Sequence, residues 1–568
     1  MRKSVCYVLI VFSFPITLFS QLSDAFRSPI DTTIKLAGNF AELRPNHFHG
    51  GLDIKTNNKE GMAIHAIGDG YVSKVRVSTY SYGKMLFITH PNGVVSVYAH
   101  LQSFNDTIRK YVKARQYKDQ SYEIELKLKP GQIPVRKGDL IALSGNTGAS
   151  EGPHLHLEIR DTSTEIAYNP LLFGFQIEDH MAPAVQSLMI YPADTAARIS
   201  GINAIKKAKV VRSKGNYKVA ESVVIAGPVY FGIEAYDSED HSPNKNGVYS
   251  LEMNLDGKKI YGLKMDTLHF GDTRYVNTLT DYPEKLRSGK NIYRCYVSKN
   301  NNLKIYNNVN DRGIVCFSDE KVHEIEFILR DFSGNITKVV LQIKSKEHDC
   351  TKEKMDLSEK QINYFDCKKD NKFETSGFSI NLPAGMLYED VYSDYSVKDS
   401  SNSFFSSIHH VQNKNIPVHD YFDMAIKTKN VQARLESKLT IFAAVSGVRS
   451  IKDCHYENGF VKGKLRLFGD FKVVADTVPP IIKPINIKNN KNMSTQAEIR
   501  IVIDDKLSGI QTYSASIDNN WVLMEYDYKK KLLWYTFDES VTPDKHIFEL
   551  KVTDERGNIA SYKANFVR

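Results

Sequence analysis

The chain has 568 residues, which is too long for a single hydrophobic core, so we expect three or four domains. It carries 75 Lys and Arg against 66 Asp and Glu, a formal net charge of +9. This mild excess would favour an anionic polymer, but it equally fits an ordinary solvated surface, and it gives no reason to expect a nucleic-acid partner.

Residues 1–20 have the pattern of a secretion signal. Arg2 and Lys3 form a basic end, Val5 to Phe19 are mostly apolar, and the small Ser20 suits a cleavage site. A retained N-terminal anchor is the alternative, although the apolar run is slightly short for a membrane span and contains Pro15. No later stretch is apolar enough to span a bilayer. We therefore expect a mature chain in the periplasm or outside the cell, with no membrane span.

Residues 21–178 are rich in Gly turns and short alternating strands, which predicts an antiparallel β domain. The strands expected from alternation are Tyr71–Val77, Met85–Thr89, Val94–Leu101 and two strands within 132–144. Residues 102–130 are interpreted as an insertion over the rim of a site, with a helical stretch to residue 117 and an alternating stretch over 118–128. Its role, as a lid or in substrate selection, stays open.

From residue 180 onward strand follows strand, and part of the pattern is repeated. His323 to Asn335 aligns with His546 to Asn558, each an alternating strand that ends in a D-x-x-G-N turn. This pattern is typical of the last hairpin of an immunoglobulin-like sandwich. We predict such sandwiches at 180–345 and 476–568, a linker at 346–372 and a further β domain at 373–475. Trp521 and Trp534 are expected in the core of the last domain.

Removal of the predicted signal would also remove Cys6, which leaves five cysteines. This odd and sparse count excludes a disulfide framework. A Cys295–Cys316 bridge and a Cys350–Cys367 bridge are both compatible with an oxidising compartment, and the sequence does not choose between them.

Two short segments carry the chemistry of the N-terminal part. His49-Gly-Gly-Leu-Asp53 offers an imidazole and a carboxylate, and His154-Leu-His156 offers two further imidazoles. Strand alternation turns His154, His156 and Glu158 away from the apolar residues between them. Two imidazoles and a carboxylate are a ligand set that leaves a fourth position of a catalytic zinc open. The residues alone do not decide which of His154 and His156 would take the metal.

For the other histidines, the sequence gives weaker support for a role in the site. His100 would lie on the strand face opposite the core, together with Ser96 and Tyr98, as a candidate for proton transfer. His47 is an alternative metal ligand, but its spacing from His49 is poorer than that of Asp53. Glu158 could orient a ligand or lie plainly on the surface. The remaining ones assigned to structural roles are His65, His90, His180, His323 and His546.

With these motifs in place, residues 40–160 resemble the lysostaphin/LytM-type zinc metallopeptidases, which cleave bacterial cell walls. The matching residues are His49-x-x-x-Asp53, Tyr98-Ala-His100-Leu and Ser144-Gly-Asn-Thr-Gly148 leading into Gly152-Pro-His154-Leu-His156. The resemblance implies that His49, Asp53 and His156 bind Zn²⁺ while His100 and His154 serve catalysis. It covers about a fifth of the chain.

The resemblance implies a zinc endopeptidase whose substrate is the peptide stems and cross-bridges of peptidoglycan. The β-sandwich domains would position it on the wall or dock an envelope protein. A non-catalytic regulator of wall hydrolases is the first alternative, although all five expected site positions are filled here. An adhesin with an attached peptidase is the second. Neutral histidines would be needed, so activity is expected to fall below about pH 6. The bond cleaved is not determined.

Overall fold

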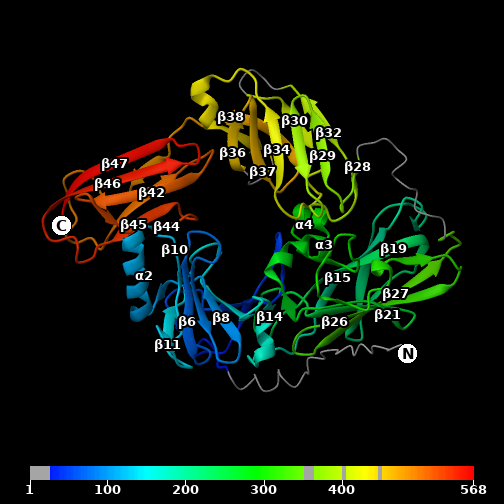
Figure 1. Cartoon of the computed structure of the whole chain (residues 1–568). Helices are drawn as coiled ribbons and strands as arrows, with labels where there is room; N and C mark the ends of the chain where they lie inside the picture. Colours follow the sequence, from blue (N-terminus) through cyan, green and yellow to red (C-terminus); the bar gives the residue numbers. More distant parts are fainter. Residues whose placement is uncertain (1–25, 351–363, 400–404, 445–450) are drawn as a thin grey trace, which may run out of the picture.

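The computed structural model describes residues 26–350, 364–399, 405–444 and 451–568. The predicted signal at 1–20 lies outside these residues. The chain is mostly β-structure, and we divide it into an N-terminal part (26–178), a second part (184–345), a third part (364–475) and a C-terminal part (481–568) (Figure 1). Within the described ranges, no helix has both the length and the apolar character needed to cross a membrane.

The N-terminal part is built on an antiparallel sheet with the strand order β1-β4-β13-β8-β7-β6-β10. Its strands are β1 (Leu36–Gly38), β4 (Leu52–Lys55), β6 (Gly70–Val77), β7 (Lys84–Thr89), β8 (Val94–Ala99), β10 (Ile124–Lys127) and β13 (His154–Asp161). Short strands complete it: β2 (Leu43–Arg44), β3 (His47–Phe48), β5 (Ala63–His65), β9 (Ser103–Phe104), β11 (Pro134–Val135), β12 (Leu140–Leu143) and β14 (Ala167–Tyr168). The antiparallel β domain expected for this part is therefore present.

The predicted faces of β8 need correction. The strand ends at Ala99, and Tyr98 lies fully buried in the main core, whereas Val97 and Ala99 pack in a small separate cluster. Both faces of the strand are therefore covered. His100 follows the strand with a φ of 58°, so its direction is set by this left-handed residue and not by strand alternation.

The predicted insertion consists of a helix and a strand of the main sheet. Helix α2 (Asp106–Asp119) begins at Asn105, whose side chain accepts a hydrogen bond from the Ile108 amide, and ends at Gln120 in the left-handed conformation. Strand β10 then pairs with β6 along four residues. The later half of segment 102–130 is therefore the edge strand of the main sheet and is not an insertion outside it.

The second part is a sheet of twelve strands that is closed on itself by pairing between β19 and β27. The long strand β19 (Val223–Tyr236) pairs with β15 as well as with β27. The strands therefore form one continuous sheet, whereas an immunoglobulin-like sandwich would have two separate sheets. Its other strands are β15 (Ala184–Pro192), β16 (Arg198–Ile199), β17 (Lys206–Ser213), β18 (Asn216–Val219), β20 (Ser250–Leu255), β21 (Lys258–Lys264), β23 (Ile292–Arg294), β24 (Tyr306–Asn307), β25 (Val315–Phe317), β26 (Val322–Arg330) and β27 (Ile336–Ser345). Strand β22 (Thr267–Leu268) instead pairs with β14, and the two parts share one hydrophobic core.

Short helices connect the elements of these two parts and the third. They are η1 (Pro170–Phe173), η2 (Phe270–Tyr275), α3 (Val276–Leu279), α4 (Tyr282–Ser288), η3 (Asp311–Gly313) and η5 (Ala433–Lys438).

The third part has its own core between a five-stranded and a four-stranded sheet. Its strands are β28 (Tyr364–Phe365), β29 (Asn371–Thr375), β30 (Phe378–Leu382), β31 (Val391–Tyr392), β32 (Tyr395–Lys398), β33 (Ile408–Val411), β34 (Phe422–Lys427), β35 (Leu439–Ala443), β36 (Lys452–Glu457), β37 (Phe460–Leu465) and β38 (Gly469–Ala475). Strand β28 and the start of β29 fall within the segment 346–372 that we interpreted as a linker.

The C-terminal part is a two-sheet sandwich around a third core. Its strands are β39 (Ile481–Pro484), β40 (Lys491–Asn492), β41 (Glu498–Asp504), β42 (Ile510–Ile517), β43 (Asn520–Val522), β44 (Glu525–Asp527), β45 (Leu532–Thr536), β46 (Lys545–Asp554) and β47 (Ile559–Val567). The repeated hairpin is found as β26–β27 and β46–β47. The immunoglobulin-like assignment of these parts stays a prediction.

The cysteines pair differently from either expected bridge. Cys316 forms a disulfide with Cys350, while Cys295, Cys367 and Cys454 are buried free thiols. Cys316 lies in strand β25, and Cys350 follows β27 after a short extension. This extension runs back along the second part and so brings Cys350 next to Cys316. The spacing of the cysteines in the sequence did not predict this pair.

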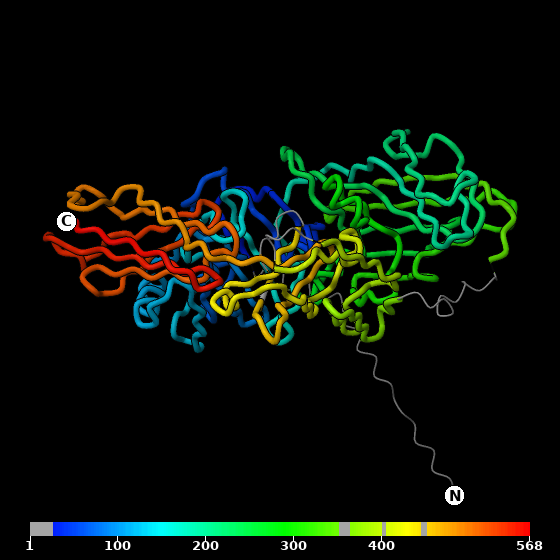
Figure 2. The backbone as a smooth tube through the Cα atoms, turned by 90° about the horizontal axis from the view of Figure 1, so that it is seen from above, coloured from blue at the N-terminus to red at the C-terminus, as the bar shows by residue number. Residues whose placement is uncertain are grey.

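The four parts form a ring in which the C-terminal part returns to the N-terminal part (Figure 1). Lys113 of α2 forms an ion pair with Asp538 at 2.7 Å, and Trp521 packs edge-on against Tyr117 of α2. Figure 2 shows the same arrangement from above, with the C-terminal part over the end that carries α2. Trp521 and Trp534 are both only partly buried, so the expectation that they lie in the core is wrong.

Candidate metal centre

Three side chains converge between neighbouring strands. Asp53 of β4 lies directly opposite His156 of β13 in the sheet register, so their side chains share a face. His49 precedes β4. The His156 Nδ1 atom lies 2.8 Å from Asp53 Oδ1, and His49 Nε2 lies 3.0 Å from both of these atoms. The three side chains are at most 7 % exposed.

In the turn before β4, the backbone at Gly51 lies very close to the backbone of β13. A Cβ atom at Gly51 would stand 2.3 Å from the Leu157 carbonyl oxygen, which no side chain can tolerate. The absent side chain therefore lets His49 and Asp53 approach the same point. Close contact with β13, and not only a tight turn, is what this glycine permits.

Outer contacts fix which ring atoms face the centre. His49 Nδ1 lies 2.7 Å from the Asn39 carbonyl oxygen, and His156 Nε2 lies 2.9 Å from Glu158 Oε1. Both nitrogens are therefore hydrogen-bond donors. The second oxygen of Asp53, Oδ2, accepts from Arg44, so Oδ1 is the oxygen left for the centre.

The ligand atoms suit a cation. With the outer nitrogens protonated, neutral His49 and His156 direct lone pairs at an Asp53 oxygen that also carries only lone pairs. Burial lowers the pKa of His49 to about 4. Burial opposes the charged form of His156 as well, but hydrogen bonds to Asp53 and Glu158 raise its pKa to about 9. Without a cation, the His156 ring would therefore hold a second proton toward Asp53, and a metal bound to its unprotonated form would displace that proton. Two nitrogens with one oxygen match zinc.

Two further histidines flank this centre. His100 Nδ1 lies 2.8 Å from the Thr147 carbonyl oxygen, and His154 Nδ1 lies 2.8 Å from that of Gly152. Their ring centroids are 4.8 Å apart. The buried His154 Nε2 lies 3.2 Å from Asp53 Oδ1 but makes no hydrogen bond. Burial, and then the neighbouring His156 and His154, lower the pKa of His100 to about 3.

All five histidine and aspartate positions singled out in the sequence therefore lie together, whereas the alternative ligand does not. The exposed His47 lies outside the group of converging atoms, and its Nδ1 contacts the Pro45 carbonyl oxygen instead. Glu158 is fully buried against His156, so it is not a plain surface residue.

Sequence reasoning missed three neighbours of the site. Tyr82 packs against His156 with ring centroids 5.0 Å apart, Arg44 binds Asp53, and Asn39 contributes only its backbone oxygen. Burial and the nearby Glu158 raise the pKa of Tyr82 well above its usual value. None of the three lies within a recognisable motif, so only their proximity in the fold could reveal them.

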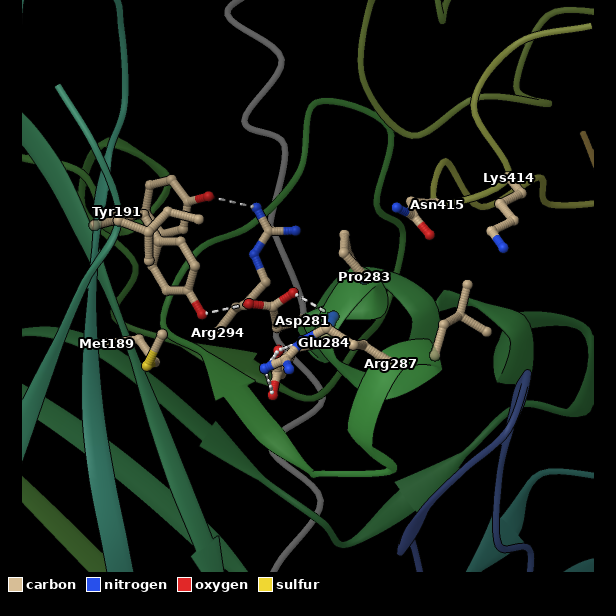
Figure 3. A pocket seen from close by; sticks show the side chains of 12 residues that line it. Met189, Tyr191, Asp281, Pro283, Glu284, Arg287, Arg294, Lys414 and Asn415 are labelled. Carbon is tan, nitrogen blue, oxygen red and sulfur yellow. Dashed lines mark hydrogen bonds and ion pairs between the residues drawn. The ribbon is translucent and has the colours of Figure 1, made fainter. Parts of the chain in front are cut away.

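A separate pocket of about 540 Å³ is lined by residues of the second part and by Lys414 and Asn415 of the third, and it contains none of these site residues (Figure 3). Several of its polar groups are paired with one another. The Tyr191 hydroxyl lies 2.7 Å from Asp281 Oδ2, and Arg294 donates to the Tyr230 hydroxyl at 3.1 Å. The convergent histidines therefore remain the candidate active site.

Two family models match the chain. Residues 47–117 match peptidase family M23, and residues 362–476 match the Zu5-like domain. Within the N-terminal part, the chain thus carries a segment that matches peptidase family M23, and further β-structure follows it.

Curated relatives match over this same domain. The chain is 34 % identical over 129 residues to an uncharacterized metalloprotease of Haemophilus influenzae, which is 23 % of this chain and 21 % of the relative. It is 30 % identical over 146 residues to the peptidoglycan DD-endopeptidase ShyA of Vibrio cholerae, covering 24 % of this chain and 28 % of that one. The chain spans only about a fifth to somewhat over a quarter of the length of such relatives.

A solved structure, a zinc-containing peptidase from Vibrio cholerae, is 29 % identical and covers 24 % of this chain and 37 % of that chain, with a TM-score of 0.19.

Proposed function

We propose that this chain is a zinc-dependent endopeptidase that hydrolyses peptide cross-links of peptidoglycan outside the cytoplasm. The observation that carries the proposal is the convergence of His49 Nε2, Asp53 Oδ1 and His156 Nδ1 beside two further imidazoles. The curated names of partial relatives, among them a peptidoglycan DD-endopeptidase, support the substrate class.

His49, Asp53 and His156 would hold the zinc ion. When bound, zinc supplies Lewis acidity toward a water molecule and toward the scissile carbonyl group. Because Arg44 occupies Asp53 Oδ2, Asp53 would bind the zinc ion through Oδ1 alone. Asn39 and Glu158 keep the two histidines in the tautomers that present an unprotonated nitrogen.

His100 and His154 would handle the proton. Each gives its Nδ1 hydrogen to a backbone carbonyl, so each presents Nε2 as the acceptor. The low pKa of His100 keeps that ring neutral at neutral pH, as a hydrogen-bond acceptor must be. After taking a proton, the same rings can donate it to the leaving amine or stabilise a developing oxyanion.

The remaining parts would position the enzyme. The third and C-terminal parts are candidates for contact with the wall or with an envelope protein. The predicted signal at residues 1–20 would deliver the chain to the periplasm or the exterior.

Digestion of purified peptidoglycan by residues 21–568, with products identified by mass, tests the proposal. We expect release of uncross-linked peptides that stops when a chelator removes the metal and resumes when zinc is restored. The masses of the products would also name the cleaved bond. A zinc-loaded chain that releases nothing from any peptidoglycan type would contradict the proposed activity and favour the non-catalytic regulator. Fragments from residue 180 onward that bind sacculi without the peptidase part would favour the adhesin.

A further inference from the structure

A second group of ligand atoms lies at the junction between the N-terminal and second parts. Asp179 lies in the segment that enters the second part, Asp237 directly follows β19, and Asp331 directly follows β26. One carboxylate oxygen from each lies within 4.8 Å of the other two. Among the described residues, no Lys, Arg or His forms an ion pair with any of these three carboxylates. The nearby His180 pairs with Asp240 instead, at 2.6 Å.

Asp237 is the residue that makes this group more than an acidic cluster. It is 5 % exposed, and its buried Oδ1 atom has no hydrogen-bond partner among the described residues. Asn246 exchanges both backbone hydrogen bonds with Asp237, which places their side chains on one face, and its Oδ1 atom is also buried and unpartnered. Burial, and then the charges of Asp331 and Asp179, raise the pKa of Asp237 to about 9. Leaving such oxygens unpaired in a protein interior is costly.

A similar group of three aspartates occurs a second time in the chain. Asp476, Asp505 and Asp554 occupy the corresponding positions at the entry of the C-terminal part. The amide of Asn335 reaches the Asp179 carbonyl at 3.2 Å, and that of Asn558 reaches the Asp476 carbonyl at 3.0 Å.

The two copies differ at the middle aspartate. In the second copy, Asp505 Oδ1 accepts hydrogen bonds from the backbone amides of Leu507, Ser508 and Gly509. The corresponding Asp237 Oδ1 has none. Three backbone amides therefore satisfy in one copy an oxygen that the other copy leaves free for a ligand.

We propose that Asp179, Asp237 and Asp331 bind a divalent cation of the Ca²⁺ class, with Asn246 as a further oxygen donor. The donors are all oxygens, which suits a hard cation and not the zinc of the histidine centre. Sites in extracellular modules bind Ca²⁺ with a Kd of roughly 10⁻⁴–10⁻³ M, and a similar affinity is expected here.

The cation would tie the second part to the strands of the histidine centre. The segment between Asp237 and Asn246 contacts β1 and β4, because Glu239 accepts a hydrogen bond from the Leu36 amide at 3.0 Å. Lys55 of β4 donates to Ser242 at 3.0 Å. Ordering this segment would therefore order the strand that carries Asp53.

Equilibrium dialysis of the zinc-loaded chain, residues 21–568, against radioactive Ca²⁺ tests the proposal. Asp237→Asn keeps the shape and removes the charge, and Asp505→Asn is the matched change in the second copy. We expect wild type and Asp505→Asn to bind one more Ca²⁺ ion than Asp237→Asn. Equal binding by wild type and Asp237→Asn up to about 10 mM, well above the Kd typical of such modules, would overturn the proposal.

Thermal unfolding separates a lost ligand from a damaged fold. Without divalent cations at pH 7, Asp237→Asn should melt at a higher temperature than wild type, because folding of the wild type must add a proton to a carboxylate that is ionised in the unfolded chain. Saturating Ca²⁺ should raise the wild-type midpoint by roughly 5 °C or more and leave Asp237→Asn unchanged. Hydrogen exchange at residues 36–38 and 52–55 should slow with Ca²⁺ in wild type alone. A Ca²⁺-induced shift of the same size in Asp237→Asn would also overturn the proposal.

Discussion

The histidines around the candidate metal centre differ in which ring nitrogen forms a hydrogen bond with the surrounding protein. Backbone carbonyls hold Nδ1 of His49, His100 and His154, so these rings present Nε2. A buried carboxylate holds Nε2 of His156, so that ring presents Nδ1. Each ring is therefore fixed in orientation before any substrate arrives, which is what a preorganised site requires.

Changes at the two flanking histidines should separate catalysis from metal binding. We expect His100→Asn and His154→Ala to keep their zinc and to lower kcat by about 10²–10⁴-fold, the usual contribution of general acid–base groups. Asn is chosen at residue 100 because it tolerates the left-handed backbone there. Zinc content and kcat are measured on the same samples. Loss of zinc from both variants would instead make these residues ligands.

Glu158 should matter through His156 and not through substrate. In Glu158→Gln the acceptor of the His156 Nε2 hydrogen loses its charge, and zinc affinity should fall about 10–100-fold. Competition with a chelator measures this affinity, and excess zinc should restore kcat. A fall in kcat that persists at saturating zinc would contradict the positioning role.

Strand periodicity was sufficient to predict that His154, His156 and Glu158 lie on one face, because side chains along a strand alternate between its two faces. It could not find Arg44 or Tyr82, since neither shares an element with a predicted ligand. It also gave a wrong reason for the direction of His100, which depends on a single left-handed residue after β8. The positions were thus predictable where a regular element sets them.

Among the elements, the two repeated hairpins each begin with a histidine that forms an ion pair with a partly exposed aspartate of a neighbouring turn. His323 pairs with Asp256 and His546 with Asp518, each at 2.7 Å. Burial opposes the charged form of His546, but its bonds to Asp518 and to the Thr542 carbonyl raise its pKa above the usual value. A raised folded-state pKa stabilises the fold below about pH 6.5, and this stabilisation is lost as the pH rises through the folded value.

The C-terminal part should therefore lose stability from pH 6 to pH 9, and His546→Gln should lose less. Both tryptophans of the chain lie in this part, so the unfolding midpoint followed by tryptophan fluorescence reports on it alone. His455→Gln, at an exposed position of the third part, is the control and should behave as wild type. An equal pH dependence in wild type and His546→Gln would show that the pair contributes nothing.

Elements were predicted well where alternation or repetition was long. The hairpins β26–β27 and β46–β47 and the strands β6 and β7 lie where the sequence placed them. The insertion was harder to interpret, because the four residues of β10 join the sheet only through pairing with the distant β6. The disulfide was also missed, since Cys316 and Cys350 meet only after β27 has been placed.

On the scale of the whole molecule, the ring brings the C-terminal part onto the loop that orients both flanking histidines. Lys529 donates to the carbonyl oxygens of Asn146 at 2.6 Å and Ser150 at 2.9 Å. The same loop supplies the carbonyl groups of Thr147 and Gly152 to His100 and His154. Contacts between residues almost 400 positions apart have no local signal in the sequence, so this closure could not be predicted.

Removal of the Lys529 ammonium group should loosen this loop. In Lys529→Ala we expect faster hydrogen exchange over residues 144–152 and a kcat several-fold lower, with zinc content unchanged. Lys530→Ala, whose side chain pairs with Asp527 three residues earlier, is the matched control. Unchanged exchange in Lys529→Ala would mean that the C-terminal part does not support the site.

His49, Asp53 and His156 are proposed to hold the zinc that cleavage requires. The most direct test is to measure zinc content and cleavage of cross-linked peptidoglycan together for wild type, His156→Ala and His47→Ala. We predict about one zinc ion per chain and full cleavage for wild type and His47→Ala, and neither zinc nor cleavage for His156→Ala. Zinc-dependent cleavage that survives in His156→Ala, or is lost equally in His47→Ala, would contradict the account.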